Sequence, residues 1–181
     1  MQALRSPLHC FALSLIALVA GCGDSGGGGS DSVMSPRLTP QFTAGSGSTS
    51  TPLGRATFAL GENFKVKRIT GDWHVELKAH PELDVAVQQI VFEKDAQSGW
   101  HSHPGPVFIQ VVSGTMTFYE SADPNCTPIV RSAGQGYLDA GEHAHIARNE
   151  SGVQATNIVT YLAPPGAALR KDEPDPGNCP F

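Results

Sequence analysis

The stretch SGWHSHPGPVFIQVVSG, residues 98–114, decides the fold and the site predicted for this chain. It places His101 and His103 one residue apart, directly before an apolar run rich in Val and Ile. Such β-branched runs favour a strand, and successive side chains of a strand point to opposite faces. His101 and His103 are therefore predicted to project together from one face.

Similar short runs recur from Arg55 onward, separated by Gly, Pro, Asn and Asp, and no long segment with helical periodicity competes with them. This spacing favours an all-β sandwich or barrel, with a single jelly roll as the expected architecture. The predicted strands are residues 64–70, 73–78, 84–93, 106–112, 115–120, 127–132, 143–149 and 154–162.

A second pair of histidines, His143 and His145, stands in the predicted strand 143–149. Two such pairs in an all-β chain indicate a metal site, because neutral imidazoles are natural ligands for Fe, Zn, Cu and Ni. The remaining histidines, His9, His74 and His80, are isolated and are expected to be structural or exposed.

The first pair resembles a motif of the cupin superfamily, whose members are small β-barrels. That motif runs Gly, five residues, His-x-His, three or four residues, Glu, six residues, Gly. Here His101 and His103 match the histidines and Gly114 the closing glycine, whereas Val107 stands at the Glu position. The opening glycine is displaced, since Gly99 lies only two residues before His101.

The stretch GQGYLDAGEHAHIARN, Gly134 to Asn149, is similar to the second cupin motif: Gly, five residues, Pro-x-Gly, two residues, His, three residues, Asn. His145 lies four positions before the final Asn, as the motif requires. Gly141 stands one position too early, so one residue is expected to be inserted. Asp139 or Ala140 occupies the place of the Pro. The resemblance implies a single cupin domain at residues 55–181, with the motifs in residues 84–163.

The resemblance implies that His101, His103 and His145 bind a metal ion. Val107 cannot bind one, and no carboxylate is expected to complete the set. His143 is expected to share the face of His145 and is the candidate catalytic residue, acting as a fourth ligand, an outer hydrogen-bond donor or a substrate-binding base.

The missing carboxylate has a consequence for ligand choice. A divalent ion held by three neutral imidazoles keeps more positive charge than one that is also bound by Glu, so an anionic ligand is favoured. Gln110, by alternation with Val107, should face away from the site. Certain cupin oxygenases, including thiol and diketone-cleaving dioxygenases, resemble this site in using three histidines without Glu.

A divalent metal is therefore implied, with Fe(II) favoured and Zn, Mn, Ni or Cu as alternatives. Two functions stay open: a dioxygenase acting on a small anionic or bidentate substrate, and a non-catalytic cupin that binds a small molecule or metal.

The N-terminal residues predict export and anchoring. Residues 1–21 are typical of a signal peptide, and LVAGC, Leu18 to Cys22, resembles a bacterial lipobox in which the Cys is lipidated. Residues 22–54 are predicted to be a disordered linker behind this anchor, because 22 of the 32 residues from 23 to 54 are Gly, Ser, Thr or Pro. The expected location is the bacterial cell envelope, outside the cytoplasm.

The cysteines that remain in the mature chain agree with export. Once Cys10 is removed with the signal peptide and Cys22 is lipidated, Cys126 and Cys179 form an even pair in an oxidising compartment. Both lie in turn-rich sequence, which predicts a disulfide between them.

The composition limits the kinds of molecule that the protein is expected to bind. The formal net charge is −5, and no Lys/Arg cluster exceeds the pair at 170–171, which argues against nucleic acid. A small-molecule ligand or substrate is expected, with membrane contact through the lipid anchor only. Homodimerisation is implied by the resemblance alone.

Overall fold

The computed structural model describes residues 42–60, 64–66, 77–79 and 82–181. The chain divides into two units, residues 1–37 and 38–181, and every described residue belongs to the second. The predicted signal peptide, Cys22 and residues 22–41 of the predicted linker lie outside the described residues. None of the described residues forms a helix long and apolar enough to cross a membrane.

The described part of the chain is built from strands without a helix. β-Branched and aromatic residues fill the central strands, where they pack well on a pleated surface. The strands are β1 (Ser46–Ala59), β2 (Phe64–Val66), β3 (Leu77–Ala79), β4 (Glu82–Gln97), β5 (His101–Ser102), β6 (Val107–Ser113), β7 (Thr115–Glu120), β8 (Ile129–Ser132), β9 (Gly136–Asp139), β10 (His145–Arg148), β11 (Ala155–Ala163) and β12 (Lys171–Asp172).

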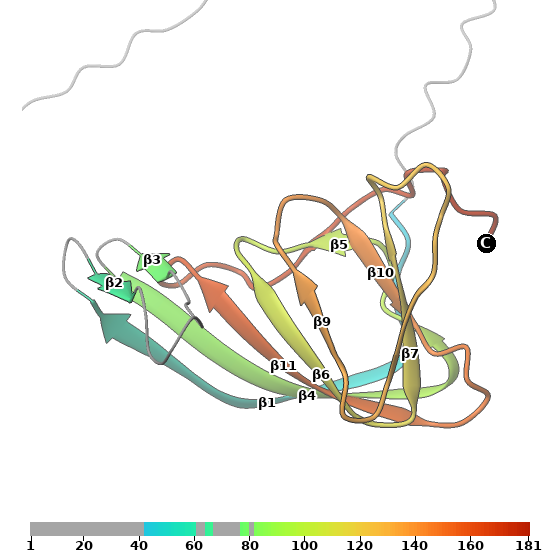
Figure 1. Ribbon diagram of the computed structural model, residues 1–181, viewed down its shortest axis with the longest axis horizontal. Helices are drawn as coiled ribbons and strands as arrows, with labels where there is room; N and C mark the ends of the chain where they lie inside the picture. The colour runs from blue at the N-terminus through green and yellow to red at the C-terminus, as the bar shows by residue number, and fades with distance from the viewer. Residues whose placement is uncertain (1–41, 61–63, 67–76, 80–81) are drawn as a thin grey trace, which may run out of the picture. The chain divides into compact units, whose positions relative to one another are not determined.

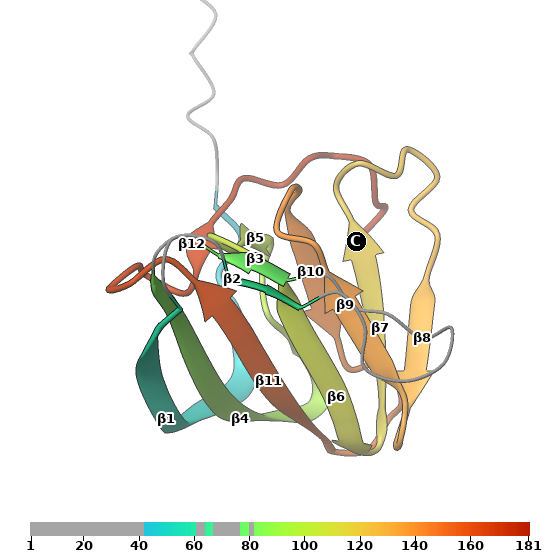
Figure 2. The same cartoon turned by 60° about the vertical axis from the view of Figure 1, so that its left-hand side comes forward.

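One antiparallel sheet contains all of these strands except β2 and β3, which pair with each other. Its main order is β12-β5-β10-β4-β11-β6-β9, with β1 paired to β4 and β7 paired to β10 and β8. The long strands β4, β11 and β6 lie side by side and curve together (Figure 1). The sheet curls into a nearly closed barrel (Figure 2). The predicted all-β single jelly-roll barrel is confirmed.

Strand β1 corrects the predicted boundary of the linker. Residues 46–54, assigned to the linker, form the first part of β1, and their register with β4 runs from Ser46↔Gln97 to Gly54↔Val87. Every position of β1 is exposed, as expected of a strand at a sheet edge. The sheet therefore begins nine residues before the predicted domain.

The barrel interior holds the main hydrophobic core. In β6 the side chains alternate strictly, so that Val107, Ile109 and Val111 are buried while Phe108 and Gln110 are exposed. This alternation follows from the two-residue period of a strand. Facing strands complete the core with large side chains such as Phe92, Phe118 and Tyr161.

The turn between β6 and β7 explains the glycine that closes the first motif. Gly114 has a φ of 72°, in the left-handed region that favours glycine. A Cβ at this position would lie 2.8 Å from Cα and Cβ of Ala155. A larger residue would therefore push β6 away from the start of β11.

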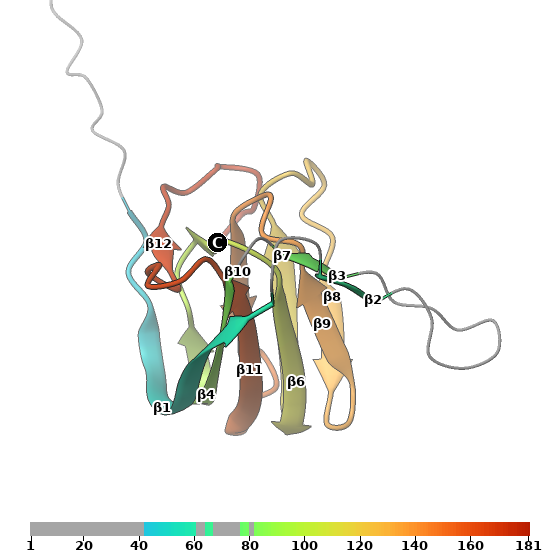
Figure 3. The ribbon, with the colours of Figure 1, turned by 90° about the vertical axis from the view of Figure 1, so that its left-hand side faces the viewer.

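The segment after β11 passes over one end of the barrel (Figure 3). Its two-residue strand β12 pairs with β5, so Lys171 lies opposite Ser102 and Asp172 opposite His101. The predicted disulfide between Cys126 and Cys179 is confirmed and fastens this segment to the loop after β7. We call residues 164–181 the strap.

Candidate metal centre

The structure brings His101, His103 and His145 together. His101 in β5 lies directly opposite His145 in β10, and His103 returns to the same face two residues after His101. The ring centroids are 4.4 Å apart for His101 and His145, 4.8 Å for His101 and His103, and 5.2 Å for His103 and His145. All three are buried, and one nitrogen from each lies within 4.8 Å of the others. This cluster has the donor set that the sequence predicts.

Two of the rings are fixed by backbone carbonyls. Nδ1 of His101 lies 2.8 Å from the carbonyl oxygen of Gly99, and Nδ1 of His103 lies 2.6 Å from that of Leu169. A carbonyl only accepts, so each Nδ1 carries the proton and donates. The lone pair of each Nε2 is therefore free, which is the usual arrangement for histidines that bind a metal.

Burial keeps these two imidazoles neutral. It lowers the pKa of His101 far below its ordinary value, and the nearby His145 and Arg170 add to the effect. Burial also lowers the pKa of His103 to about 4, although the hydrogen bond to Leu169 opposes the shift. Neutral imidazole is the form that binds a metal ion, so both residues are ready to bind one at neutral pH.

The expectation that His143 shares the face of His145 is wrong. Strand β10 begins at His145, so His143 lies in the preceding loop, where strand alternation does not apply. His143 is exposed. It lines a cavity of about 190 Å³, which His145 and Asp139 also line, and it does not line the cavity that all three clustered histidines share.

A carboxylate that the sequence analysis did not assign lies at the cluster. Asp139, the last residue of β9, is buried, and its Oδ2 is 3.1 Å from Nδ1 of His145 and 3.9 Å from Nε2 of His103. Burial alone would raise the pKa of Asp139, but the contact with His145 and the N–H of Gly141 outweigh it and lower the pKa. The sequence predicts that no carboxylate completes the ligand set, and the structure places the carboxylate of Asp139 beside two of the three histidines.

The closing Asn of the second motif is a structural residue. Asn149 is fully buried, and its Nδ2 donates to the carbonyl oxygens of Phe92, Glu93 and Val153 at 3.1, 2.9 and 2.6 Å. Its Oδ1 accepts from both the backbone N–H and the hydroxyl of Ser151. These bonds tie the end of β10 to β4 and so fix the strand that carries His145.

A cavity of about 490 Å³ opens beside the three histidines. One part of its wall is apolar, formed by side chains such as Ile90, Phe92 and Ile109. Another part is polar. Ser50 donates to Oε1 of Gln88 at 2.9 Å, and the buried Oδ1 of Asn157 has no hydrogen-bond partner within the described part of the chain. The cavity thus offers a small molecule both apolar contact and hydrogen bonds.

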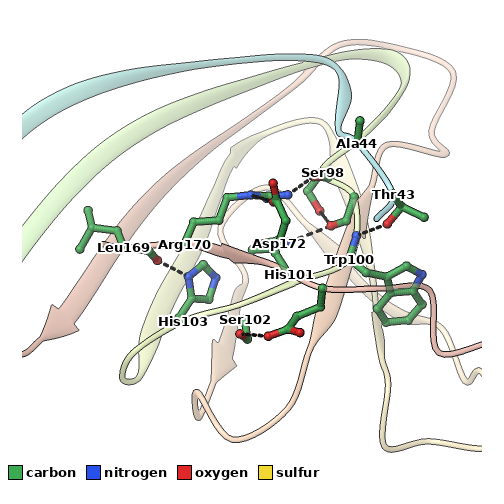
Figure 4. Close-up of polar contacts among 12 residues, drawn as sticks. Thr43, Ala44, Ser98, Trp100, His101, Ser102, His103, Leu169, Arg170 and Asp172 are labelled. Carbon is green, nitrogen blue, oxygen red and sulfur yellow. Dashed lines mark hydrogen bonds and ion pairs between the residues drawn. The ribbon is translucent and has the colours of Figure 1, made fainter. Parts of the chain in front are cut away.

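The strap forms a further part of this wall. Figure 4 shows its polar contacts with the segment that carries His101 and His103. Leu169 and Arg170 both line the cavity. The guanidinium of Arg170 donates to the carbonyl oxygen of Ser98 at 2.7 Å and to Oδ1 of Asp172 at 2.7 Å. Ser102, between the two histidines, donates to Glu173 at 2.8 Å. The strap therefore both lines the cavity and contacts the segment that carries His101 and His103.

Comparison with solved structures finds barrels of this kind. A cupin-like protein from Thermotoga maritima is 20% identical, with a TM-score of 0.44 over 50% of this chain and 65% of that one. A double-stranded β-helix protein from Klebsiella pneumoniae is 17% identical, with a TM-score of 0.43 over 64% and 87%. A DMSP lyase from Ruegeria pomeroyi is 14% identical, with a TM-score of 0.42 over 48% and 42%.

No protein-family model matches the chain, and no curated protein matches it. At these identities the likeness to solved structures concerns the fold. The chemistry of the site has to follow from the side chains of this chain.

Proposed function

We propose that this protein binds a divalent metal ion through His101, His103 and His145, and that the ion binds a small molecule in the adjoining cavity. The observation that carries the proposal is the convergence of three buried imidazoles. In two of them the outer N–H is already held by a carbonyl. In His145 neither nitrogen has a hydrogen-bond partner among the described residues, and a buried polar atom in that state indicates a missing ligand.

The first candidate activity is that of an Fe(II)-dependent dioxygenase acting on a small anionic or bidentate substrate. A bound Fe(II) would supply the activation of O₂, which closed-shell Zn(II) does not. The protein would hold the substrate against the polar wall at Gln88 and Asn157, and the apolar wall would limit the access of water. Arg170 also lines this cavity, where it is paired with Asp172.

One observation favours the alternative, a cupin that binds its ligand without transforming it. Apart from the three histidines, the titratable side chains among the described residues that line the cavity are Tyr161, Arg170 and Asp172. Burial raises the pKa of Tyr161 to about 12, and Asp172 is already paired with Arg170. A proton acceptor for catalysis would have to come from the substrate or the metal.

Metal analysis and reconstitution test the proposal. The domain, purified without a His-tag, should contain one divalent ion per chain, and the apo-protein should regain it from Fe(II) or Zn(II). Fe(II)-loaded protein should consume O₂ with a member of a panel of diketones, thiols and flavonols, while Zn(II)-loaded protein should not. Ligand-induced thermal stabilisation without O₂ uptake would establish the binding protein instead, and the absence of any bound metal would overturn the proposal.

We propose further that the protein is anchored to the bacterial envelope through lipid on Cys22. The support is the LVAGC stretch together with the Cys126–Cys179 disulfide, which fits an oxidising compartment. Mass spectrometry of the mature N-terminus should find acyl chains on Cys22, and Cys22→Ser should release the protein from membranes. An unmodified mature N-terminus would contradict the anchor.

A further inference from the structure

Part of the wall of the cavity beside the histidines is built in rows that run across neighbouring strands. Strands β1, β4, β11 and β6 lie side by side in that order (Figure 2). Directly opposed residues of antiparallel strands point to the same face. One such row consists of Ser50, Ile90, Asn157 and Val111, and the first three of these line the cavity.

The histidines and Asn157 lie at different levels of this wall. Tyr161 packs beside His103, with ring centroids 5.4 Å apart. The inner face of β11 carries Asn157, Val159 and Tyr161 in turn, and all three are buried. At a rise of about 3.3 Å per residue, the Cα atoms of Asn157 and Tyr161 are separated by about 13 Å along the strand. A ligand bound to the metal ion therefore has to extend past Val159 to reach Asn157.

The side-chain amide of Asn157 is buried with its oxygen unpartnered. The residue is 1% exposed, and its Oδ1 accepts no hydrogen bond from the described residues. Its neighbours on either side in the row are Ile90 and Val111, whose apolar side chains cannot donate one. Because buried polar groups are almost always hydrogen-bonded, the donor is expected to come from the cavity.

The other amides nearby are hydrogen-bonded by the protein itself. Asn149 is also fully buried, and both ends of its amide are bonded, Nδ2 to backbone carbonyls and Oδ1 to Ser151. Gln88 lines the same cavity as Asn157, and its Oε1 accepts from the hydroxyls of Ser50 at 2.9 Å and Tyr161 at 3.4 Å. The unpartnered oxygen of Asn157 is therefore an exception that calls for a ligand.

The cavity thus has two unsatisfied polar groups. Within its described lining, only His145 and Asn157 have buried side-chain atoms without a hydrogen-bond partner. The nitrogens of His145 belong to the proposed metal site. The oxygen of Asn157 is left for the molecule that the ion binds.

We propose that Oδ1 of Asn157 accepts a hydrogen bond from the far end of an elongated ligand whose near end binds the metal ion. The inference rests on the metal site of the proposed function and names its ligand class. The ligand has an acidic, bidentate head, an apolar middle that lies against Val159 and Ile109, and a neutral hydroxyl at the opposite end. A hydroxyl suits this end better than an ammonium group, because the apolar Ile90 and Val111 beside Asn157 offer a charge no partner.

Matched hydroxamic acids test the ligand class on Zn(II)-loaded wild-type protein. A hydroxamate binds a metal ion through two oxygen atoms. In each pair, one straight-chain acid ends in a hydroxyl and the other in a methyl group, and the chain is lengthened one carbon at a time. Once the chain is long enough to pass Val159, the hydroxyl member should bind about 10-fold more tightly, because the methyl member leaves Oδ1 unpartnered. Shorter pairs should show no preference for the hydroxyl. Isothermal titration calorimetry gives each Kd, and elemental analysis after titration checks that the ion stays bound.

A variant of Asn157 tests the residue. Asn157→Leu has a side chain of similar size without an acceptor, so the two members of a long pair should bind it with equal Kd. Thr156→Val is the matched control, because Thr156 is the next residue of β11 and its side chain points to the other face. It should keep the wild-type preference. A structure of the wild-type protein with Zn(II) and the long hydroxyl probe needs no variant to fold, and it should place the hydroxyl oxygen about 2.5–3.0 Å from Oδ1 of Asn157.

The possible failures are distinguishable. Wild-type protein that binds no metal would overturn the proposed function together with this inference. Metal-loaded protein that binds none of the hydroxamates, or binds the two members of every pair equally, would overturn this inference and leave the metal site standing. A preference that persists in Asn157→Leu would assign the hydroxyl to another residue and overturn the role of Asn157.

Discussion

The carbonyl oxygen of Leu169 lies 2.6 Å from Nδ1 of His103, although the two residues are 66 positions apart. This bond, drawn in Figure 4, fixes the tautomer of a candidate ligand through a residue of the strap. It makes the geometry of the metal site depend on the strap.

Removing the disulfide should therefore affect both stability and metal binding. Cys126 and Cys179 close a loop across a separation of 53 residues. Their replacement by Ser should lower the free energy of unfolding by about 2–5 kcal/mol. We expect metal affinity to fall about 10-fold, because the Leu169 carbonyl becomes less firmly held. Urea unfolding and chelator competition measure the two effects. Unchanged affinity in the destabilised variant would show that the strap stays docked without the bond.

Variants of single histidines should distinguish the three proposed metal ligands from His143, which lies close to them in sequence. His101→Ala, His103→Ala and His145→Ala should each lose bound metal, because each removes a buried nitrogen of the cluster. His143→Ala should retain it, since His143 is exposed in the loop before β10. Elemental analysis after dialysis gives the occupancy. Loss of metal from the His143 variant with retention in the His145 variant would reverse the assignment.

Acid should weaken the attachment of β1 to the barrel through Asp84. A hydrogen bond from Thr57, another from the N–H of Gly166 and the contact with Arg55 lower the pKa of Asp84 from 3.8 to about 2. Because the pKa is lower in the folded state, the unfolded chain takes up the proton first as the pH falls. The stabilisation is complete above about pH 4 and is lost between about pH 4 and 2.

Asp84→Asn tests this dependence in the apo-protein. Between about pH 4 and 2, the free energy of unfolding should fall less steeply in the variant than in wild type. Glu82→Gln, an exposed carboxylate of the same strand, serves as the control and should keep the wild-type slope. Equal slopes in wild type and Asp84→Asn would contradict the assignment.

Shortening the chain should show that β1 belongs to the domain. A chain that begins at residue 55 lacks the part of β1 that pairs with β4 from Gly54↔Val87 to Ser46↔Gln97. It also lacks Ser48 and Ser50, which line the cavity. Compared with a chain that begins at residue 38, it should be less stable by about 2 kcal/mol or more, since several ladder hydrogen bonds of about 1 kcal/mol each are lost. Equal melting temperatures would argue against this role.

The sequence correctly predicts those features of the fold and of the candidate site that follow from the two-residue period of a strand. Alternation in β6 correctly buries Val107 and exposes Gln110, and the i, i+2 spacing correctly brings His101 and His103 to one face. The same spacing is not sufficient outside a strand: His103 lies just past the end of β5 and joins the cluster, whereas the residue two positions before β10 does not. That residue is His143.

Two other features could not be predicted from the sequence. The register that sets Asp139 opposite Val107 is invisible in the sequence, which shows only a departure from the expected Pro. Strand β1 escapes prediction for another reason. An edge strand that is exposed at every position needs no apolar alternation, so its Ser- and Thr-rich start resembles a linker. The Thr residues at 49 and 51, which favour strands, are the only local signal.

The contact between the strap and His103 also makes the tautomer of this ring depend on the C-terminal residues of the chain. A chain in which every strand through β11 has paired still lacks the Leu169 carbonyl, so the imidazole of His103 is free to present either nitrogen. The presentation of a candidate ligand inside the barrel therefore depends on residues that follow the last long strand.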